Sequence, residues 1–393
     1  MSCRHYPAGK AARTNLSLQK RDFVVTEHLY VATRKGLFTF AWDGIAWKVA
    51  QTAFLGDPVL IVHAAKKSNM LYAALGHGHF GVKLHRSDDR GKTWTECAAP
   101  EYPAPPDGTE DKCPNRQIPI PWRTEMIWAM ADGNANGQHQ LWCGTVPGGL
   151  FRSNDHGDSW ELNRSLWDNP LRRQWFGGGL DFPGIHSICV DPRDNNRLFA
   201  GVSCGGVWLT EDGGDTWTTR TEGMFAAYMP DSRKLDPSIQ DPHCVAMCRN
   251  EPDTLWVQHH NGAFRTTDGG KQWTELKDME PSNFGFAVAA HPENPQTAWF
   301  VPAIKDELRI PVDGKLVVTR TTDGGRSFDV LRNGLPQEHA YDITFRHAMD
   351  VCETGCSLAF GTTTGSLFLS GNAGDDWTCA HAHLPPVYCV RFG

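Results

Sequence analysis

The chain has 393 residues and a formal net charge of −7, with 21% charged side chains. Without blocks of Lys and Arg, this mildly acidic chain lacks the electrostatic footprint of a nucleic-acid-binding protein. No run approaches the roughly 20 apolar residues that a membrane-spanning helix needs, and residues 1–22 lack the apolar stretch of a secretory signal. We therefore expect a cytoplasmic protein without nucleic-acid or membrane partners.

The 12 cysteines are spread singly along the chain. Several of them, such as Cys143, Cys189 and Cys389, lie within apolar runs. This distribution favours buried thiols in a reducing compartment over a disulfide framework.

A turn-like segment with the pattern Ser/Thr-x-Asp-x-Gly-x-x-Trp recurs along the chain. Its copies, in chain order, are an eroded one at 40–47, well-formed ones at 87–94, 153–160, 210–217, 266–273 and 321–328, and a degenerate one at 370–377. The interval between copies ranges from 46 residues (Asp43 to Asp89) to 66 residues (Asp89 to Asp155), the scale of a four-stranded blade with variable loops. The hydroxyl and the carboxylate accept backbone N–H bonds in such a turn, Gly takes a positive φ, and Trp folds back as an apolar plug.

Short apolar runs lie ahead of each turn. The pairs directly upstream are 141–145 with 149–152, 198–202 with 206–209, 255–259 with 262–265, and 358–362 with 366–369, and further upstream lie runs such as 185–192 and 242–248. Each unit is therefore predicted to contain strands A, B and C, the turn, and strand D. An arginine precedes four of the turns at a constant offset, and we expect these side chains to pair with a neighbouring blade: Arg86, Arg152, Arg265 and Arg320.

The first unit begins at strand B, over residues 28–33, and an orphan strand at 386–392 ends the chain. The last strand is thus expected to complete the first blade and to close the ring, which removes an exposed sheet edge. The sequence predicts an all-β, seven-bladed β-propeller at residues 23–393, preceded by a tail at residues 1–22.

The five well-formed turns resemble those of the BNR or Asp-box repeat propellers, whose members are often described as sialidase-like or glycosyl-hydrolase-like proteins. The resemblance covers nearly the whole chain, and we call these segments Asp-box turns. It implies the propeller fold and leaves the activity open, because related repeats occur in sialidases, xyloglucanases, sortilin-type receptors and a photosystem assembly factor.

Long insertions identify the expected functional face. They span 98–121, 161–183 and 221–241 between strands D and A, and 303–315 between strands B and C. In a propeller these connections share one face, opposite the Asp-box turns, and surround the mouth of the central channel.

Residues that start strand A or lie in the B-to-C loops are the candidate site residues. The expected catalytic residues are His186, His243, Tyr388, Glu307 and Asp342. The expected ligand-binding residues are Arg34, His77, His79, Trp122, Arg123, Glu125, Cys204, His259, Lys305 and Arg309. The same selection includes Asp241, Tyr341, Lys35 and Asp306.

A transition metal such as zinc is the one cofactor that the histidines suggest. The expected ligands come from adjacent blades: His186, His243, His259 and His260. Neutral imidazole is a preferred ligand of zinc and of related metals.

We favour a polar, His-rich site that binds or processes a small polar or anionic molecule or a saccharide, in the manner of a hydrolase or lyase. A His or Tyr base would act there, with Lys305, Arg309 or Arg34 holding a carboxylate.

Two alternatives remain. Arg309, Ile310 and Pro311 resemble the Arg-Ile-Pro of sialidases, which implies a sialidase-like glycoside hydrolase, although these residues lie in the sixth repeat rather than near the start. The other alternative is a non-catalytic scaffold whose insertion-rich face binds a protein partner, with the 177–179 glycine run as an adaptable contact loop.

Overall fold

The computed structural model describes residues 28–65, 68–133, 135–137 and 139–393. These residues form seven four-stranded antiparallel sheets, one per blade. Blade one contains β28 (Val387–Phe392), β1 (His28–Thr33), β2 (Gly36–Trp42) and β3 (Trp47–Ala53). Blade two contains β4 (Val59–Ala65), β5 (Met70–Gly76), β6 (Val82–Ser87) and β7 (Thr95–Cys97). Blade three contains β8 (Met126–Gly133), β9 (Gln140–Val146), β10 (Leu150–Ser153) and β11 (Glu161–Leu162).

The other four blades repeat this order. Blade four contains β12 (Ile185–Asp191), β13 (Asp194–Val202), β14 (Gly206–Thr210) and β15 (Thr218–Thr219). Blade five contains β16 (Pro242–Met247), β17 (Leu255–His259), β18 (Gly262–Thr266) and β19 (Thr274–Leu276). Blade six contains β20 (Phe284–Ala290), β21 (Ala298–Ala303), β22 (Val318–Thr321) and β23 (Asp329–Leu331), and blade seven β24 (Met349–Val351), β25 (Leu358–Gly361), β26 (Leu367–Ser370) and β27 (Thr378–His381).

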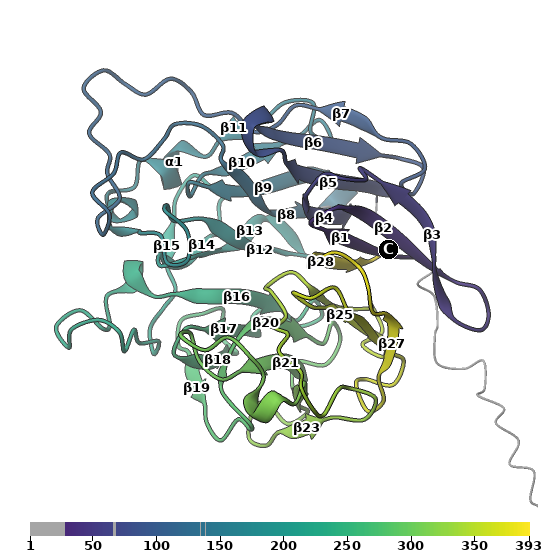
Figure 1. The fold of residues 1–393 in the computed structure, drawn as a ribbon. Helices are drawn as coiled ribbons and strands as arrows, with labels where there is room; N and C mark the ends of the chain where they lie inside the picture. Colours follow the sequence, from purple (N-terminus) through teal and green to yellow (C-terminus); the bar gives the residue numbers. More distant parts are fainter. Residues whose placement is uncertain (1–27, 66–67, 134, 138) are drawn as a thin grey trace, which may run out of the picture.

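The first strands of the blades form the inner ring. β28 contacts β4, β4 contacts β8, and the series continues through β12, β16, β20 and β24 back to β28. Figure 1 shows β4, β8, β12, β16, β20 and β28 toward the middle of the molecule, with outer strands such as β7, β19 and β23 at its periphery. The predicted all-β, seven-bladed propeller is therefore confirmed.

The two ends of the described chain meet in blade one. β28 pairs antiparallel with β1 in a register that joins Val31 to Val390 and Leu29 to Phe392. The last strand of the chain thus supplies strand A of the first blade, as the orphan run at 386–392 predicts. The expected tail at residues 1–22 lies outside the described residues.

Hydrogen bonds within the Asp-box turns explain why this pattern recurs. In the copy of blade three, Ser153 Oγ donates to Asp155 Oδ1 (2.8 Å) and accepts from the backbone N–H of Gly157 (2.9 Å). Asp155 Oδ1 also accepts from the backbone N–H of Ser159 (2.9 Å). Gly157 has φ 89°, a region that favours glycine. The turn satisfies its own backbone donors, so the pattern has a structural function.

The arginines that precede the turns join successive blades. Each Nη1 donates to a carbonyl in the Asp-box turn of the next blade: Arg86 to His156 (3.1 Å), Arg152 to Gly213 (3.3 Å), Arg265 to Gly324 (3.3 Å) and Arg320 to Ala373 (3.1 Å). The expected pairing with a neighbouring blade is present in all four cases. These side chains thus give donors to turn carbonyls that the sheet hydrogen bonds leave over.

Large aromatic side chains fill the spaces between sheets. Trp142, Trp256 and Trp299, which the sequence places on strand B, are fully buried, as is Trp208 on strand C. Replacing any of them with Ala would cost about 3 to 5 kcal/mol of stability. The eleven cysteines of the described part are all free.

Most helical segments of the described residues lie in insertions on one face: η1 (Gly78–Phe80), α1 (Arg164–Trp167), η3 (Pro170–Gln174), η4 (Pro237–Ile239) and η5 (Val312–Gly314). The other one, η2 (Ala135–Gly137), lies between strands A and B of blade three, on the face of the Asp-box turns. No helix in the described ranges has the length and apolarity to cross a membrane. Two insertions are tied together by a buried ion pair between Arg172 and Asp111. Tyr102 in the 98–121 insertion donates to the carbonyl of Pro147 (2.6 Å). These loops therefore form a packed wall.

Candidate functional site

Three side chains converge where blade five opens onto the channel mouth. Asp241 directly precedes β16, His243 is the second residue of that strand, and His260 lies in the turn between β17 and β18. The register pairs Pro242 with His259, which brings the start of β16 and the end of β17 to the same edge of the sheet. The repeat order therefore places all three residues on the insertion-rich face.

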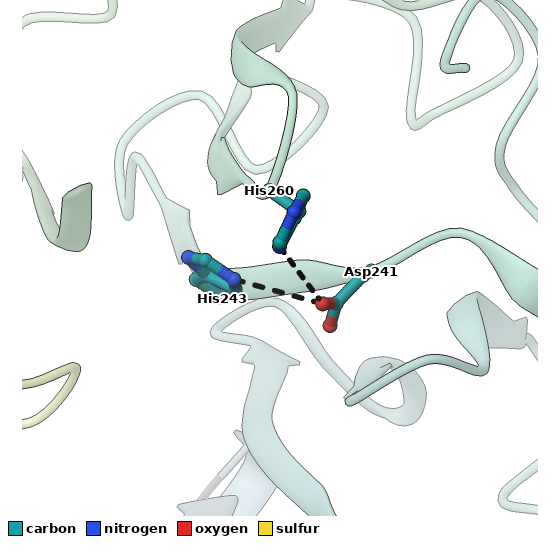
Figure 2. A group of neighbouring side chains, drawn as sticks. All are labelled: Asp241, His243 and His260. Carbon is teal, nitrogen blue, oxygen red and sulfur yellow. Dashed lines mark ion pairs between the residues drawn. The ribbon is translucent and has the colours of Figure 1, made fainter. Parts of the chain in front are cut away.

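Both imidazoles are directed at one carboxylate oxygen (Figure 2). Asp241 Oδ2 lies 3.6 Å from His243 Nε2 and 3.5 Å from His260 Nδ1. The side chains of Asp241 and His243 are 7% and 4% exposed, and that of His260 is 22% exposed. Within the described residues, this is the one group of three or more His, Cys, Asp or Glu side chains whose ligand atoms all lie within 4.8 Å of one another.

The charges of the group follow from burial and mutual proximity. Burial opposes ionisation of Asp241, but the facing imidazoles hold the pKa of this carboxyl well below its usual range. Burial lowers the pKa of His243, and the Asp241 carboxylate offsets part of this effect. For the more exposed His260, the same carboxylate raises the pKa. The group thus combines an ionised carboxylate with two imidazoles of different basicity.

Aromatic rings enclose His243. Its ring stacks on that of Phe286, with centroids 4.6 Å apart and planes 13° apart. Phe284 meets it edge-on at 5.7 Å. These contacts and a hydrogen bond of 2.7 Å between Nδ1 and the carbonyl oxygen of Gly285 fix the imidazole in one orientation.

Two guanidinium groups lie near the same aromatic ring. Arg309 lies 5.2 Å and Arg346 5.5 Å from the centre of the Phe286 ring, and Arg346 also lies 4.9 Å from that of Trp128. Arg309 is paired with the carboxylate of Asp306. Among the residues that the structure describes, no carboxylate lies within ion-pairing distance of Arg346, and its Nε is buried without a hydrogen-bond partner. Burial lowers the pKa of Arg346, an effect that leaves a guanidinium protonated.

Loops from blades three, four and five form the wall of the site. The backbone N–H of Cys204 donates to Asp241 Oδ1 at 3.1 Å. A Cβ built on Gly178 would lie 3.0 Å from Cys204 Sγ and 3.7 Å from Asp241 Oδ2. The ring of Tyr228 meets that of His260 edge-on at 5.0 Å.

The structure brings together several of the residues that the sequence singled out. His243, His260, Cys204 and Arg309, together with Asp241 from the wider selection, lie at this site. His259 and His186 are buried close by but face elsewhere. Each nitrogen of His259 lies 3.0 Å from a backbone N–H, those of Asp241 and Asn261. His186 Nδ1 lies 2.8 Å from the hydroxyl of Ser187, and its ring meets Trp128.

The remaining expected residues lie apart from this group. Glu307 pairs with Lys305 (3.5 Å), Arg123 with Glu125 (2.7 Å), and His77 with Asp57 (3.5 Å). His79 meets Phe80, Trp122 packs edge-on against Trp167, Arg34 and Lys35 are exposed, and Tyr388 lies in β28.

Blade seven differs from the expectation. Its strand A begins at Met349, so Tyr341 and Asp342 do not start that strand. Tyr341 is 60% exposed, and Asp342 accepts a hydrogen bond from Thr364 (2.7 Å). Arg346, three residues ahead of β24, lies at the channel mouth instead of Tyr341 and Asp342.

Sequence reasoning missed five residues of this site: Arg346, Tyr228, Trp128, Phe284 and Phe286. Arg346 and Tyr228 lie in connecting segments, and Trp128 and Phe286 are the third residues of β8 and β20. Their shared place, the third position of strand A, was therefore the sequence signal that could have identified Trp128 and Phe286.

Comparison with known proteins gives matches at low identity. The family model described as "Sortilin, neurotensin receptor 3" matches residues 148–343. An oligoxyloglucan-reducing end-specific xyloglucanase of Emericella nidulans is 24% identical over 284 residues, which is 65% of this chain and 32% of that protein. Xyloglucanase Xgh74A of Acetivibrio thermocellus is 25% identical over 143 residues, 32% of this chain and 16% of that protein. The chain thus spans a third or less of these relatives.

Solved structures with the same fold include a GH74 xyloglucanase from Xanthomonas campestris, with a TM-score of 0.57 and 17% identity over 91% of this chain and 53% of that one. A functionally unknown protein from Desulfotomaculum acetoxidans has a TM-score of 0.54 and 9% identity, covering 92% of this chain and 99% of that one. At these identities the likeness shows the fold. The matches place the chain among β-propeller proteins, which agrees at that level with the resemblance carried by the Asp-box turns.

Proposed function

We propose that the channel mouth binds a small saccharide that carries a negative charge and processes it by hydrolysis or elimination. The observation that carries this proposal is the guanidinium of Arg346, enclosed by Trp128 and Phe286 without an ion-pair partner among the described residues. It lies near the carboxylate and the two imidazoles of the Asp241 group. The site thus offers a cation for binding and acid–base groups for reaction.

The charge of Arg346 supports an anionic ligand. An enclosed guanidinium loses hydrogen bonds to water, and for Arg346 the effect of burial on the pKa outweighs the attraction of the Asp241 carboxylate, so a bound anion would stabilise it. A planar carboxylate matches its donors in two parallel hydrogen bonds. Arg309 lies on the same Phe286 ring, with its charge paired to the carboxylate of Asp306. A uronic acid would satisfy these requirements.

When no metal ion is bound, the groups available for reaction are those of Asp241, His243 and His260. Carboxylates and imidazoles are the side chains that most often transfer protons in enzymes. They come from one blade, and the aromatic rings around His243 fix the orientation of its imidazole. Aromatic walls with a few convergent polar groups are typical of small-molecule sites.

The relatives support the saccharide part of the proposal. Two of the proteins that match this chain are described as xyloglucanases, which act on a saccharide. The matched region is a third or less of either relative, so the transfer of a substrate class to this chain belongs to the proposal. Arg346 favours an anionic sugar over a neutral one.

The test uses the full chain with neutral xyloglucan oligosaccharides and with uronate-containing oligosaccharides. Binding is measured by calorimetry, hydrolysis by new reducing ends, and elimination by ultraviolet absorption of an unsaturated product. We expect the wild type to bind and turn over the uronate-containing oligosaccharides. Asp241→Asn should lose the turnover. Arg346→Met should weaken anionic binding about 10-fold or more, since charge-assisted pairs are worth about 1.5 to 3 kcal/mol.

Arg123→Met is the matched control, because Arg123 is exposed on the same face and pairs with Glu125. It should leave binding unchanged. The absence of binding and turnover with every oligosaccharide would overturn the proposed function. Equal binding of neutral and anionic sugars by the wild type and by Arg346→Met would overturn its anionic part.

A further inference from the structure

The spacing within the Asp241 group is too long for hydrogen bonds. The two distances from Asp241 Oδ2, 3.6 Å to His243 Nε2 and 3.5 Å to His260 Nδ1, exceed the usual N–H···O range of about 2.7 to 3.2 Å. Polar groups buried this deeply normally come within hydrogen-bond distance of a partner. Here they face one another across a gap.

The proton of His243 lies on the far side of its ring. Nδ1 is 2.7 Å from the carbonyl oxygen of Gly285. A carbonyl only accepts, so Nδ1 carries the hydrogen and Nε2 presents a lone pair to the carboxylate. Two lone-pair atoms that face each other are stabilised by a cation or a shared donor between them. A backbone carbonyl behind the imidazole is also the usual arrangement for a histidine that binds a metal.

The carboxylate of Asp241 is anchored in the same way. Oδ1 accepts from the backbone N–H of Cys204 at 3.1 Å, and this bond leaves Oδ2 to face the imidazoles. Cys204 has φ 46°, which is uncommon for a residue other than glycine. In this conformation its N–H points at the carboxylate. Both outer partners are backbone groups, so they position the ligand atoms rigidly.

The distances match a metal–ligand shell. Zinc binds nitrogen and carboxylate oxygen at about 2.0 to 2.2 Å, so two ligands at a tetrahedral angle lie about 3.3 Å apart. The two observed O–N distances exceed this value by a few tenths of an ångström. The two imidazole nitrogens lie within 4.8 Å of each other.

We infer that Asp241, His243 and His260 bind a first-row transition-metal dication such as Zn²⁺. Two imidazoles with one carboxylate select such metals over Mg²⁺ and Ca²⁺, which prefer oxygen ligands. Three protein ligands leave a fourth position for water or another molecule from the mouth. This inference rests on the three side chains alone and not on the proposed function, because metal binding is measured without a saccharide.

The experiment uses untagged full-length protein freed of metal with a chelator. Calorimetry with Zn²⁺ and with Mg²⁺ gives stoichiometry and affinity, and mass spectrometry of bound elements checks the count. Co²⁺ substitution supplies a reading on the wild type alone, since its visible absorption reports the number and type of ligands. We expect one Zn²⁺ per chain, no comparable Mg²⁺ binding, and a Co²⁺ spectrum of a four-coordinate site with nitrogen and oxygen ligands.

His260→Gln is the main variant because its side chain is 22% exposed and its replacement disturbs packing least. We expect its Zn²⁺ affinity to fall about 100-fold or more, since loss of an outer partner alone costs about 10- to 100-fold. His156→Asn is the matched control. His156 stacks on His139 at 4.4 Å in an Asp-box turn on the opposite face, and Asn tolerates its positive φ of 60°.

Zinc binding of less than one equivalent, or with affinity equal to that for Mg²⁺, would overturn the inference. Zinc binding that survives in His260→Gln and disappears in His156→Asn would also overturn the inference, because it would assign the ion to His139 and His156. A Zn²⁺ site in a protein that binds no saccharide would sustain this inference and count against the proposed function.

Discussion

The backbone N–H of Cys204 in blade four donates a 3.1 Å hydrogen bond to the carboxylate of Asp241 at the start of blade five. The geometry of the site is therefore shared between two blades. Gly178, from the connection between blades three and four, lies against both residues, because a Cβ at this position would be 3.0 Å from Cys204 Sγ and 3.7 Å from Asp241 Oδ2. The absence of a side chain at Gly178 keeps the approach to the carboxylate open.

Gly178→Ala should narrow this approach. The new methyl group occupies space beside Asp241, so we expect saccharide binding to weaken about 3- to 10-fold, which corresponds to about 0.7 to 1.4 kcal/mol. Stability should change by less than about 0.5 kcal/mol, because Gly178 is exposed. Calorimetry and thermal unfolding measure the two effects. Gly179→Ala is the control, since a Cβ there meets nothing within 4 Å; equal effects of both variants would contradict the assigned role.

Thiol labelling should separate Cys204 from the exposed cysteines. Burial raises the pKa of Cys204 well above its usual value, and the neighbouring Asp241 carboxylate adds to this effect. The thiolate is the reactive form, so iodoacetamide at about pH 8 should label exposed Cys356 long before Cys204. Peptide mass spectrometry gives the order of labelling. Denatured protein should label both at similar rates, and early labelling of Cys204 in the folded protein would show that the wall formed by this loop is open.

The sequence predicts the blades well because the Asp-box turn is a local structure. Its hydrogen bonds join residues two to four positions apart, as from Ser153 to Asp155 and from Ser159 to Asp155, so the pattern that forms the turn is visible in a short window. Asp241, His243 and His260 could be placed at the mouth for the same reason. Once the repeat gives the strand order, the start of strand A and the end of strand B follow.

Arg346 could not be placed this way. Its blade has a strand A of only three residues, Met349–Val351, too short for an alternating pattern to mark its start. The contact of Arg346 with Trp128 depends on how the segment ahead of β24 meets β8 of blade three, a non-adjacent blade. No local signal encodes such a contact, and the sequence-based selection chose Tyr341 and Asp342 instead.

Asp155 tests what the Asp-box carboxylate contributes. The corresponding residue of blade seven is Asn372, which keeps the acceptor bonds from Ser370 Oγ and from the backbone N–H of Asp376, both at 2.9 Å. We therefore expect Asp155→Asn to change the midpoint of thermal unfolding by about a degree, and Asp155→Ala to lower it by several degrees. Scanning calorimetry measures both. Equal losses in the two variants would mean that the charge, rather than the acceptor oxygen, stabilises the turn.

Histidines that stay neutral in the fold should make stability fall in acid. Burial lowers the pKa of His347 to about 3, with Arg391 and Arg346 adding to the effect, whereas an unfolded histidine has a pKa of about 6.5. Between these values the unfolded chain binds the proton and the folded chain does not. The stability linked to His347 is thus fully present above about pH 6.5 and declines as the pH falls toward 3.

His347→Gln removes this titration and keeps a donor for the carbonyl of His186, to which His347 Nε2 lies 2.6 Å away. We expect the variant to lose less stability than the wild type between about pH 6.5 and pH 4. The number of protons taken up on unfolding, which sets the slope of the unfolding free energy with pH, should be smaller by up to about one. Urea unfolding at a series of pH values measures the slope. His383→Gln is the control, because His383 is exposed and its change should leave the slope intact. An unchanged slope in His347→Gln would show that His347 is already protonated in the folded protein.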